Sequence, residues 1–149
     1  MRNPWWLLAA LVGFLSVGLG AFGAHALEPR LSDDGVARWA LSTRYLAAHV
    51  PLLLAVAWVN DADWGQRSAR RARAAGLTCV SGLVLFSGSL GAMALTDVTA
   101  LGAITPLGGL SLLAAWALLG AASLARAPAA ARGPASQAAG PAPRPTPPH

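Results

Sequence analysis

Four long apolar stretches dominate the pattern of hydrophobic and polar positions, and short polar segments separate them. A helix needs about 20 apolar residues, each rising about 1.5 Å, to cross about 30 Å of hydrocarbon. The stretches predict helices at about residues 5–26, 39–59, 74–95 and 101–124. Short connections force neighbouring helices to run antiparallel. The pattern therefore predicts an all-α, integral membrane four-helix bundle, with the transmembrane domain over residues 1–125.

The end of the chain has a different composition. From Arg126 to His149 it consists mainly of alanine, proline and glycine. Such a segment offers too few apolar side chains to build a core, so we expect residues 126–149 to form a disordered tail. A polyproline-type ligand for a partner is the alternative.

Composition supports a membrane protein and narrows its chemistry. Of the 149 residues, 55% are hydrophobic and 11% charged, whereas soluble domains carry about 25% charged residues. The net charge of +5 is spread between apolar stretches rather than over a polar face, which argues against nucleic-acid binding. All eleven basic residues are arginine, so no lysine is available for Schiff-base chemistry. The single cysteine, Cys79, excludes an internal disulfide and a multi-thiolate metal site.

The arginines predict the orientation. Eight of them lie on the side shared by both termini and the second connection, and three lie on the other side. By the positive-inside rule we expect both termini and the tail in the cytoplasm. Four arginines of the second connection are expected to set this topology, with contact to anionic lipid headgroups as the alternative role: Arg67, Arg70, Arg71 and Arg73.

The first apolar stretch has one alternative interpretation. Arg2, the apolar run and Ala24-His25-Ala26 resemble a signal peptide that would be cleaved after Ala26. The apolar run has about 20 residues, however, whereas that of a signal peptide has about 7 to 15. We therefore expect the first helix to be retained.

Polar side chains collect in the outer half of the predicted bundle. Such residues are costly in lipid, so their positions mark function or helix register. Tyr45 and His49 are four residues apart and share one helix face. We expect an ion pair between Arg44 and either Glu28 or Asp97, because an arginine at the membrane edge requires a carboxylate, phosphate or water. The predicted polar cluster or binding site comprises His25, Glu28, Arg44, Tyr45, His49, Ser87, Ser89, Asp97 and Thr105.

Small residues predict where helices approach each other closely. Repeats of small residues at four-residue spacing let helix backbones pack together in lipid. The expected packing positions are Ser16, Gly20, Gly23, Ala24, Gly88, Gly108 and Gly109.

Four motifs resemble those of a known family. They are Gly20-Ala21-Phe22-Gly23-Ala24-His25-Ala26-Leu27, Tyr45 with His49, Phe86-Ser87-Gly88-Ser89-Leu90, and Ile104-Thr105-Pro106-Leu107-Gly108-Gly109 followed by Trp116. In order and spacing they resemble the domain of unknown function 423 family, small bacterial inner-membrane proteins similar to the transmembrane protein 256 group. The resemblance covers about residues 7–124 and departs from the family at Leu46 and Gly91. It implies four spans and a retained first helix, and it brings no activity.

Three classes of function stay open. We expect first a structural, accessory or interaction protein, in which the polar residues satisfy one another. The alternatives are a carrier of a small molecule, ion or lipid, and a haem or redox protein with His25 and His49 at similar depth as ligands. The Gly108–Gly109 pair and Pro51 favour a carrier, since helix breaks line cavities.

No metalloprotease, nucleophile-elbow or phosphate-loop motif is present in the sequence. We therefore expect no enzymatic activity, no catalytic residue and no metal. The expected partners are the lipid bilayer and either another membrane protein or a second copy of the chain. Apart from the haem alternative, no cofactor is expected.

Overall fold

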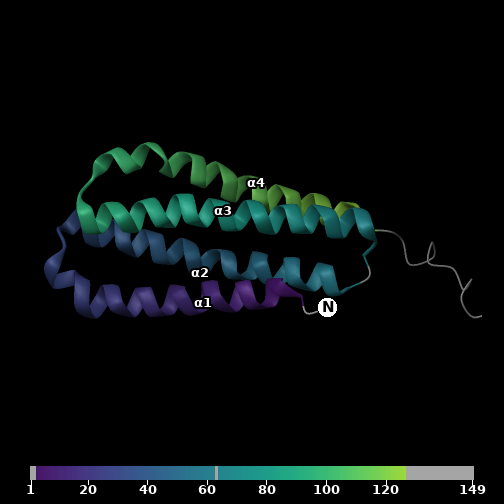
Figure 1. Cartoon of the computed structure of the whole chain (residues 1–149), viewed down its shortest axis with the longest axis horizontal. Coiled ribbons are helices and arrows are strands. Elements are labelled where there is room, and N and C mark those ends of the chain that lie inside the picture. The colour runs from purple at the N-terminus through teal and green to yellow at the C-terminus, as the bar shows by residue number, and fades with distance from the viewer. Residues whose placement is uncertain (1–2, 63, 127–149) are drawn as a thin grey trace, which may run out of the picture.

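The computed structural model describes residues 3–62 and 64–126. It contains four long helices, α1 (Pro4–Phe22), α2 (Asp33–Asp61), α3 (Gln66–Thr96) and α4 (Thr105–Leu124) (Figure 1). A π-helical turn η1 (Gly23–Leu27) and 3-10 turns η2 (Glu28–Arg30) and η3 (Thr99–Ala103) join them. No strand occurs in the described ranges, which confirms the all-α prediction. The predicted disordered tail lies outside the described residues except for Arg126.

All four helical segments are long and apolar enough to cross a membrane, which confirms a multi-pass membrane protein. With 29 residues, α2 is about 43 Å long and extends beyond about 30 Å of hydrocarbon. Two helices begin earlier than predicted, α2 at Asp33 and α3 at Gln66. Hydropathy detects only the part of a helix that lies in hydrocarbon. The hydropathy pattern therefore misses the polar first turns of these helices. In α2 the first turn is capped by Ser32, whose Oγ accepts a hydrogen bond from the Gly35 N–H at 3.1 Å.

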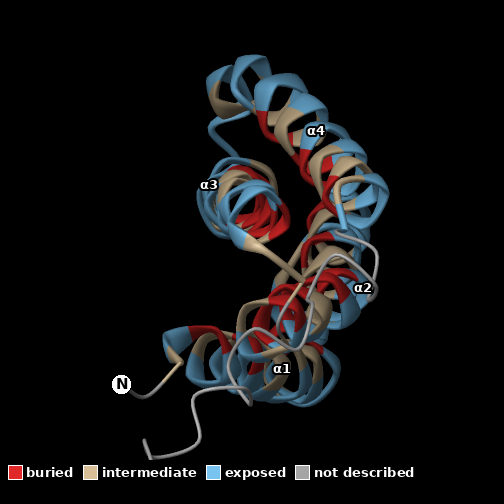
Figure 2. Ribbon diagram, turned by 90° about the vertical axis from the view of Figure 1, so that its right-hand side faces the viewer, coloured by how far each residue is buried: buried red, intermediate tan, exposed pale blue. Residues whose placement is uncertain are grey.

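The helices pack in chain order as an open row. α2 packs against α1 on one side and α3 on the other, and α4 packs against α3. Figure 2 shows α1 and α4 at opposite ends of this row. The largest apolar side chains that are fully buried, Leu52, Leu53, Val56 and Cys79, lie where α2 meets α3. The four-helix bundle is thus confirmed, but its first and last helices stay apart.

The two ends of the row carry different connections. The loop end contains η1, η2 and η3, and the terminal end contains the start of α1, the α2–α3 connection and the end of α4. At the loop end Asp97 stops α3 with a left-handed backbone, φ 55°. At the terminal end Asn3 donates to Asp61 at 2.8 Å, and Trp6 Nε1 donates to the same carboxylate at 2.6 Å. These bonds tie the start of α1 to the end of α2.

The residues expected to pack helices together divide into two groups. A Cβ at Gly108 would overlap the backbone of Phe86, and one at Gly23 would overlap the indole of Trp39, so both positions require glycine for close contact. A Cβ at Gly20 or Gly88 would meet none of the described neighbouring atoms within 4 Å. These two glycines therefore do not pack against another described helix of this chain, because each faces an opening between helices.

Candidate functional site

The nine polar residues predicted to form one cluster are distributed over several places, with at most two of them together in each. His25 and Glu28 lie on η1 and η2, exposed at the loop end. Arg44 lines a groove between α1 and α2, whereas Tyr45 lines a hollow beside α4. The prediction of a single cluster is wrong, because consecutive helical residues point about 100° apart and so face different neighbours.

Two serines join α2 to α3 by reciprocal hydrogen bonds. Ser42 Oγ donates to the Ser87 carbonyl at 2.8 Å, and Ser87 Oγ donates to the Ser42 carbonyl at 3.0 Å. Both serines are buried. Ser87 was predicted as a site residue and Ser42 was missed, although Ser42 precedes His49 by seven residues and so shares its side of the helix. The pair fixes the register of the two helices.

A second polar contact joins α3 to α4. The Ser89 and Thr105 hydroxyls lie 2.8 Å apart, and Ser89 Oγ also donates to the Phe86 carbonyl at 3.0 Å. The Ser89 hydroxyl is thereby engaged within the α3–α4 interface. Ser89 and Thr105 come together as a helix-to-helix bridge.

The expected ion pair of Arg44 is absent from the described residues. Asp97 instead lies 3.9 Å from Arg38, which also lies 3.5 Å from Asp34. Arg38 precedes Arg44 by six residues, so the two side chains point about 120° apart around α2. Arg38 faces the end of α3, and Arg44 faces away from it. Glu28 lies in the same groove as Arg44 without forming an ion pair with it.

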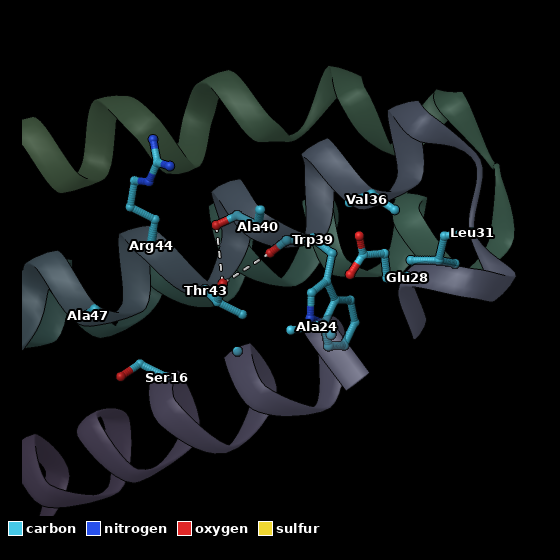
Figure 3. Close-up of a pocket in the computed structure, with 12 residues that line it drawn as sticks. Ser16, Ala24, Glu28, Leu31, Val36, Trp39, Ala40, Thr43, Arg44 and Ala47 are labelled. Carbon is cyan, nitrogen blue, oxygen red and sulfur yellow. Dashed lines mark hydrogen bonds between the residues drawn. The ribbon is translucent and has the colours of Figure 1, made fainter. Parts of the chain in front are cut away.

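The α1–α2 groove, as we call it, has a volume of about 470 Å³. Trp39 lies within it, and the indole Nε1 donates to the Leu19 carbonyl at 2.9 Å. Figure 3 shows Glu28 and Arg44 at separate positions along the groove, with Arg44 extending away from Glu28. Most other lining residues are small and come from both walls: Ser16, Gly20, Gly23 and Ala24 from α1 and η1, and Ala40, Thr43 and Ala47 from α2.

The second opening, the α2–α4 hollow, has a volume of about 340 Å³. Its lining is Tyr45, His49, Phe86, Gly109, Leu112, Leu113 and Trp116. The ring of Tyr45 lies 4.3 Å from that of Phe86 and 5.9 Å from that of His49, and the His49 and Trp116 rings are 6.2 Å apart. The sequence predicted that Tyr45 and His49 share a face, but the aromatic residues that meet them come from α3 and α4.

His25 and His49 lie at different depths. Gly13 of α1 faces Val50, the residue next to His49. His25 follows Gly13 by 12 residues, about 18 Å along the helix axis. The expectation of similar depth is wrong because α2 begins at Asp33, directly after η2, which places His49 16 residues inside that helix. The geometry therefore gives no support to a haem held by this pair.

The four arginines predicted for the second connection lie instead in the first turns of α3, and their contacts differ. Arg71 Nη1 donates to the Ala121 carbonyl at 2.9 Å, near the end of α4. Arg73 Nε donates to Asn60 Oδ1 at 2.6 Å. Arg67 and Arg70 are exposed and form no hydrogen bond or ion pair through their side chains within the described part of the chain. A role in topology or headgroup contact stays a prediction for all four.

Four apolar helices with hydroxyl bridges between them define a small multi-pass helical membrane protein. The chain belongs to the family described as protein of unknown function (DUF423), whose model matches residues 19–109. This confirms the resemblance seen in the four motifs, over a shorter range than expected.

Three relatives illustrate the family. The UPF0382 membrane protein YwdK of Bacillus subtilis (strain 168) is 39% identical over 90 residues, which covers 60% of this chain and 71% of the relative. The UPF0382 membrane protein C1782.12c of Schizosaccharomyces pombe is 35% identical over 91 residues, 60% of this chain and 71% of the relative. A UPF0382 membrane protein of Haemophilus influenzae is 36% identical over 94 residues, which covers 63% of this chain and 72% of the relative. No solved structure matches the chain significantly.

Proposed function

We propose that this protein is an accessory subunit of a membrane assembly and that the α1–α2 groove binds one transmembrane helix of a partner protein. The observation that carries the proposal is the open groove, to which both helices contribute several small residues. Small residues let helix backbones approach closely, and in lipid this close packing drives association. Gly20 illustrates the available space, since a Cβ there would meet none of the described neighbouring atoms within 4 Å.

Arg44 indicates what the partner helix carries. It lies three residues from the midpoint of α2 and is exposed to the groove. A guanidinium at this depth is costly unless a carboxylate or another acceptor meets it. Arg44 forms no ion pair with any described residue. We infer that the partner helix carries an aspartate or glutamate at the depth of Arg44.

The acidic residues of this chain disfavour a second copy as the partner. Among the four helices only α2 contains carboxylates, and these lie in its first and last turns: Asp33, Asp34 and Asp61. Two copies related by an axis along the membrane normal would place equal residues at equal depth. A second copy would therefore offer no carboxylate where Arg44 lies, and a different protein is the better partner.

Orientation, membrane and chemistry complete the proposal. Of the eight described arginines, five lie at the terminal end, Arg67, Arg70, Arg71, Arg73 and Arg126. This excess supports a cytoplasmic terminal end, with the protein in a bacterial inner membrane.

The hydroxyls of Ser42, Ser87 and Ser89 bond to neighbouring helices or to their own helix. We therefore treat the chain as a binding protein rather than an enzyme.

Photocross-linking in native membranes tests the groove. A photoreactive residue at Gly20 is expected to give a discrete adduct with another membrane protein. The cross-linked peptide should come from a spanning helix that contains Asp or Glu. The change Arg44→Gln should reduce this adduct severalfold. The same photoreactive residue at Gly120, which is exposed on α4 and likewise meets none of the described neighbouring atoms within 4 Å, is the matched control and should give no such adduct.

Three results would contradict the proposal. They are an adduct only with this chain, an adduct only with lipid, and an adduct that Arg44→Gln leaves unchanged.

A further inference from the structure

The α2–α4 hollow lies on the opposite face of α2 from the groove. Ala40, Thr43 and Ala47 face the groove, and Tyr45 and His49 point about 170° away from them at about 100° per residue. Leu113, which is 68% exposed, stands at the rim of the hollow, so the hollow opens to the lipid. His49 lies two residues from the midpoint of α2. A molecule that reaches this hollow therefore comes from the bilayer.

The hydrogen bond of His49 fixes the chemistry of its second nitrogen. His49 Nδ1 lies 2.8 Å from the Tyr45 carbonyl oxygen. A carbonyl only accepts, so Nδ1 carries the proton and donates it. In the neutral imidazole Nε2 is then a hydrogen-bond acceptor.

That acceptor faces free space. The His49 side chain is 94% buried, since its relative exposure is 6%. Nε2 forms no hydrogen bond with any described residue. Among the described side chains no polar atom is both sealed inside the protein and without a partner, so Nε2 keeps some exposed surface, and the α2–α4 hollow is the opening that His49 lines. A buried acceptor of this kind favours a ligand that donates a hydrogen bond.

The walls of the hollow select the rest of the ligand. Tyr45, Phe86 and Trp116 present aromatic rings, which pack well against another flat ring. The Tyr45 hydroxyl forms no hydrogen bond with a described residue and is available to a polar substituent. The volume of about 340 Å³ lies within the range of small-molecule sites.

We propose that the α2–α4 hollow binds a lipid-soluble phenol or quinol. The hydroxyl of the ligand donates to His49 Nε2, and its ring packs against Tyr45, Phe86 and Trp116. Gly109 leaves space for the ligand beside Phe86. A Cβ at this position would lie 3.7 Å from the Phe86 ring, and a longer side chain would occupy the hollow. The site uses a different face of α2 from the groove and does not depend on a partner helix.

Nitrogen NMR of the full chain in lipid nanodiscs tests the site. The three histidines are labelled with 15N, and 4-hexylphenol is added. The His49 Nε2 resonance is expected to shift and to saturate, while that of His25 stays unchanged. The methyl ether 4-hexylanisole has the same ring and chain but no donor. It should bind about tenfold more weakly, the effect of losing one hydrogen bond.

Two variants separate binding from partition into lipid. Gly109→Leu is expected to abolish the saturable shift, whereas Gly120→Leu, at an open position of the same helix, should retain it. The proposal is overturned if the shift does not saturate, if phenol and anisole bind equally, or if Gly109→Leu binds like the unmodified protein. The comparison of phenol with anisole needs no variant, so it holds even if Gly109→Leu does not fold.

Discussion

Two faces of α2 are built in opposite ways. Toward α3 the face is closed, with Leu53 and Val56 fully buried and Ser42 bonded to the backbone of α3. Toward α1, the loop-end half of α2 borders the open α1–α2 groove. The groove has a volume of about 470 Å³, and most of its lining residues are small. In lipid the hydrophobic effect does not drive helices together, so contact between helices requires side-chain packing and interhelical hydrogen bonds. The comparison teaches that a repeat of small residues does not by itself close a helix pair.

The first helix packs closely against its neighbours over its terminal half and at one point near the loop end. At the terminal end the ring of Trp5 lies against Gly76 of α3, and Asn3 donates to the Ala57 carbonyl at 2.9 Å. At the loop end Trp39 of α2 lies against Gly23 and donates to the Leu19 carbonyl. Ala9 and Gly13 also pack against α2 in the terminal half, and the groove opens in the loop-end half. This arrangement keeps α1 in place beside the groove to which we assign the partner helix.

The strongest test of the comparison replaces a glycine on each kind of face. Gly108→Ala is expected to lower the free energy of unfolding by about 3 kcal/mol, because the new Cβ overlaps the backbone of Phe86 and neither helix can yield locally. Gly20→Ala, the matched control, should change it by less than about 1 kcal/mol and in the stabilising direction, since alanine favours a helix. Unfolding by denaturing detergent in mixed micelles measures both. Equal losses for the two variants would mean that the groove is closed in the membrane.

The fold was predictable to the level of four spans, for a physical reason. Membrane crossing depends on the hydropathy of a local stretch, which the sequence displays directly. The earlier starts at Asp33 and Gln66 were missed because they depend on capping and on polar turns outside the hydrocarbon. The order of packing, and therefore the open row, depends on contacts between helices that no local pattern contains.

The candidate sites were predictable only within single helices. The spacing of Tyr45 and His49 placed both on one face, which the α2–α4 hollow uses. Which residues meet that face was not predictable, because Phe86 and Trp116 come from other helices. The Arg44 ion pair was wrong for the same reason, since Arg38 occupies the position facing Asp97.

A second test addresses the closed face through its serine bridge. Ser42→Ala removes one donor and leaves the buried Ser87 carbonyl without that side-chain partner. We expect a loss of about 1 kcal/mol in the free energy of unfolding, the magnitude of one hydrogen bond between membrane helices. Ser111→Ala is the control, because Ser111 donates only to the Leu107 carbonyl of its own helix. If both variants lose the same amount, the bridge between α2 and α3 has no special role.

A third test weakens the contact that holds α1 at the loop end. Trp39→Phe keeps an aromatic ring against Gly23 and removes the hydrogen bond to the Leu19 carbonyl. We expect a loss of about 0.5 to 1 kcal/mol in the free energy of unfolding. We also expect a longer distance between spin labels at the loop ends of α1 and α2, measured by electron paramagnetic resonance. An unchanged distance would show that α1 is held in place without this bond.

The smallest effect on stability is expected inside the groove itself. Ala47 is exposed there, so Ala47→Leu fills part of the groove without disturbing a packed contact. The free energy of unfolding should change by less than about 0.5 kcal/mol, as for other substitutions away from packed positions. The adduct from the photoreactive residue at Gly20 should nevertheless disappear, because the added side chain occupies the place of the partner helix. Ala117→Leu, an equal change at an exposed position of α4, should leave both quantities unaltered. If Ala47→Leu still forms the adduct, the partner helix binds elsewhere. If Ala47→Leu causes a large loss in the free energy of unfolding, this face of α2 is closed.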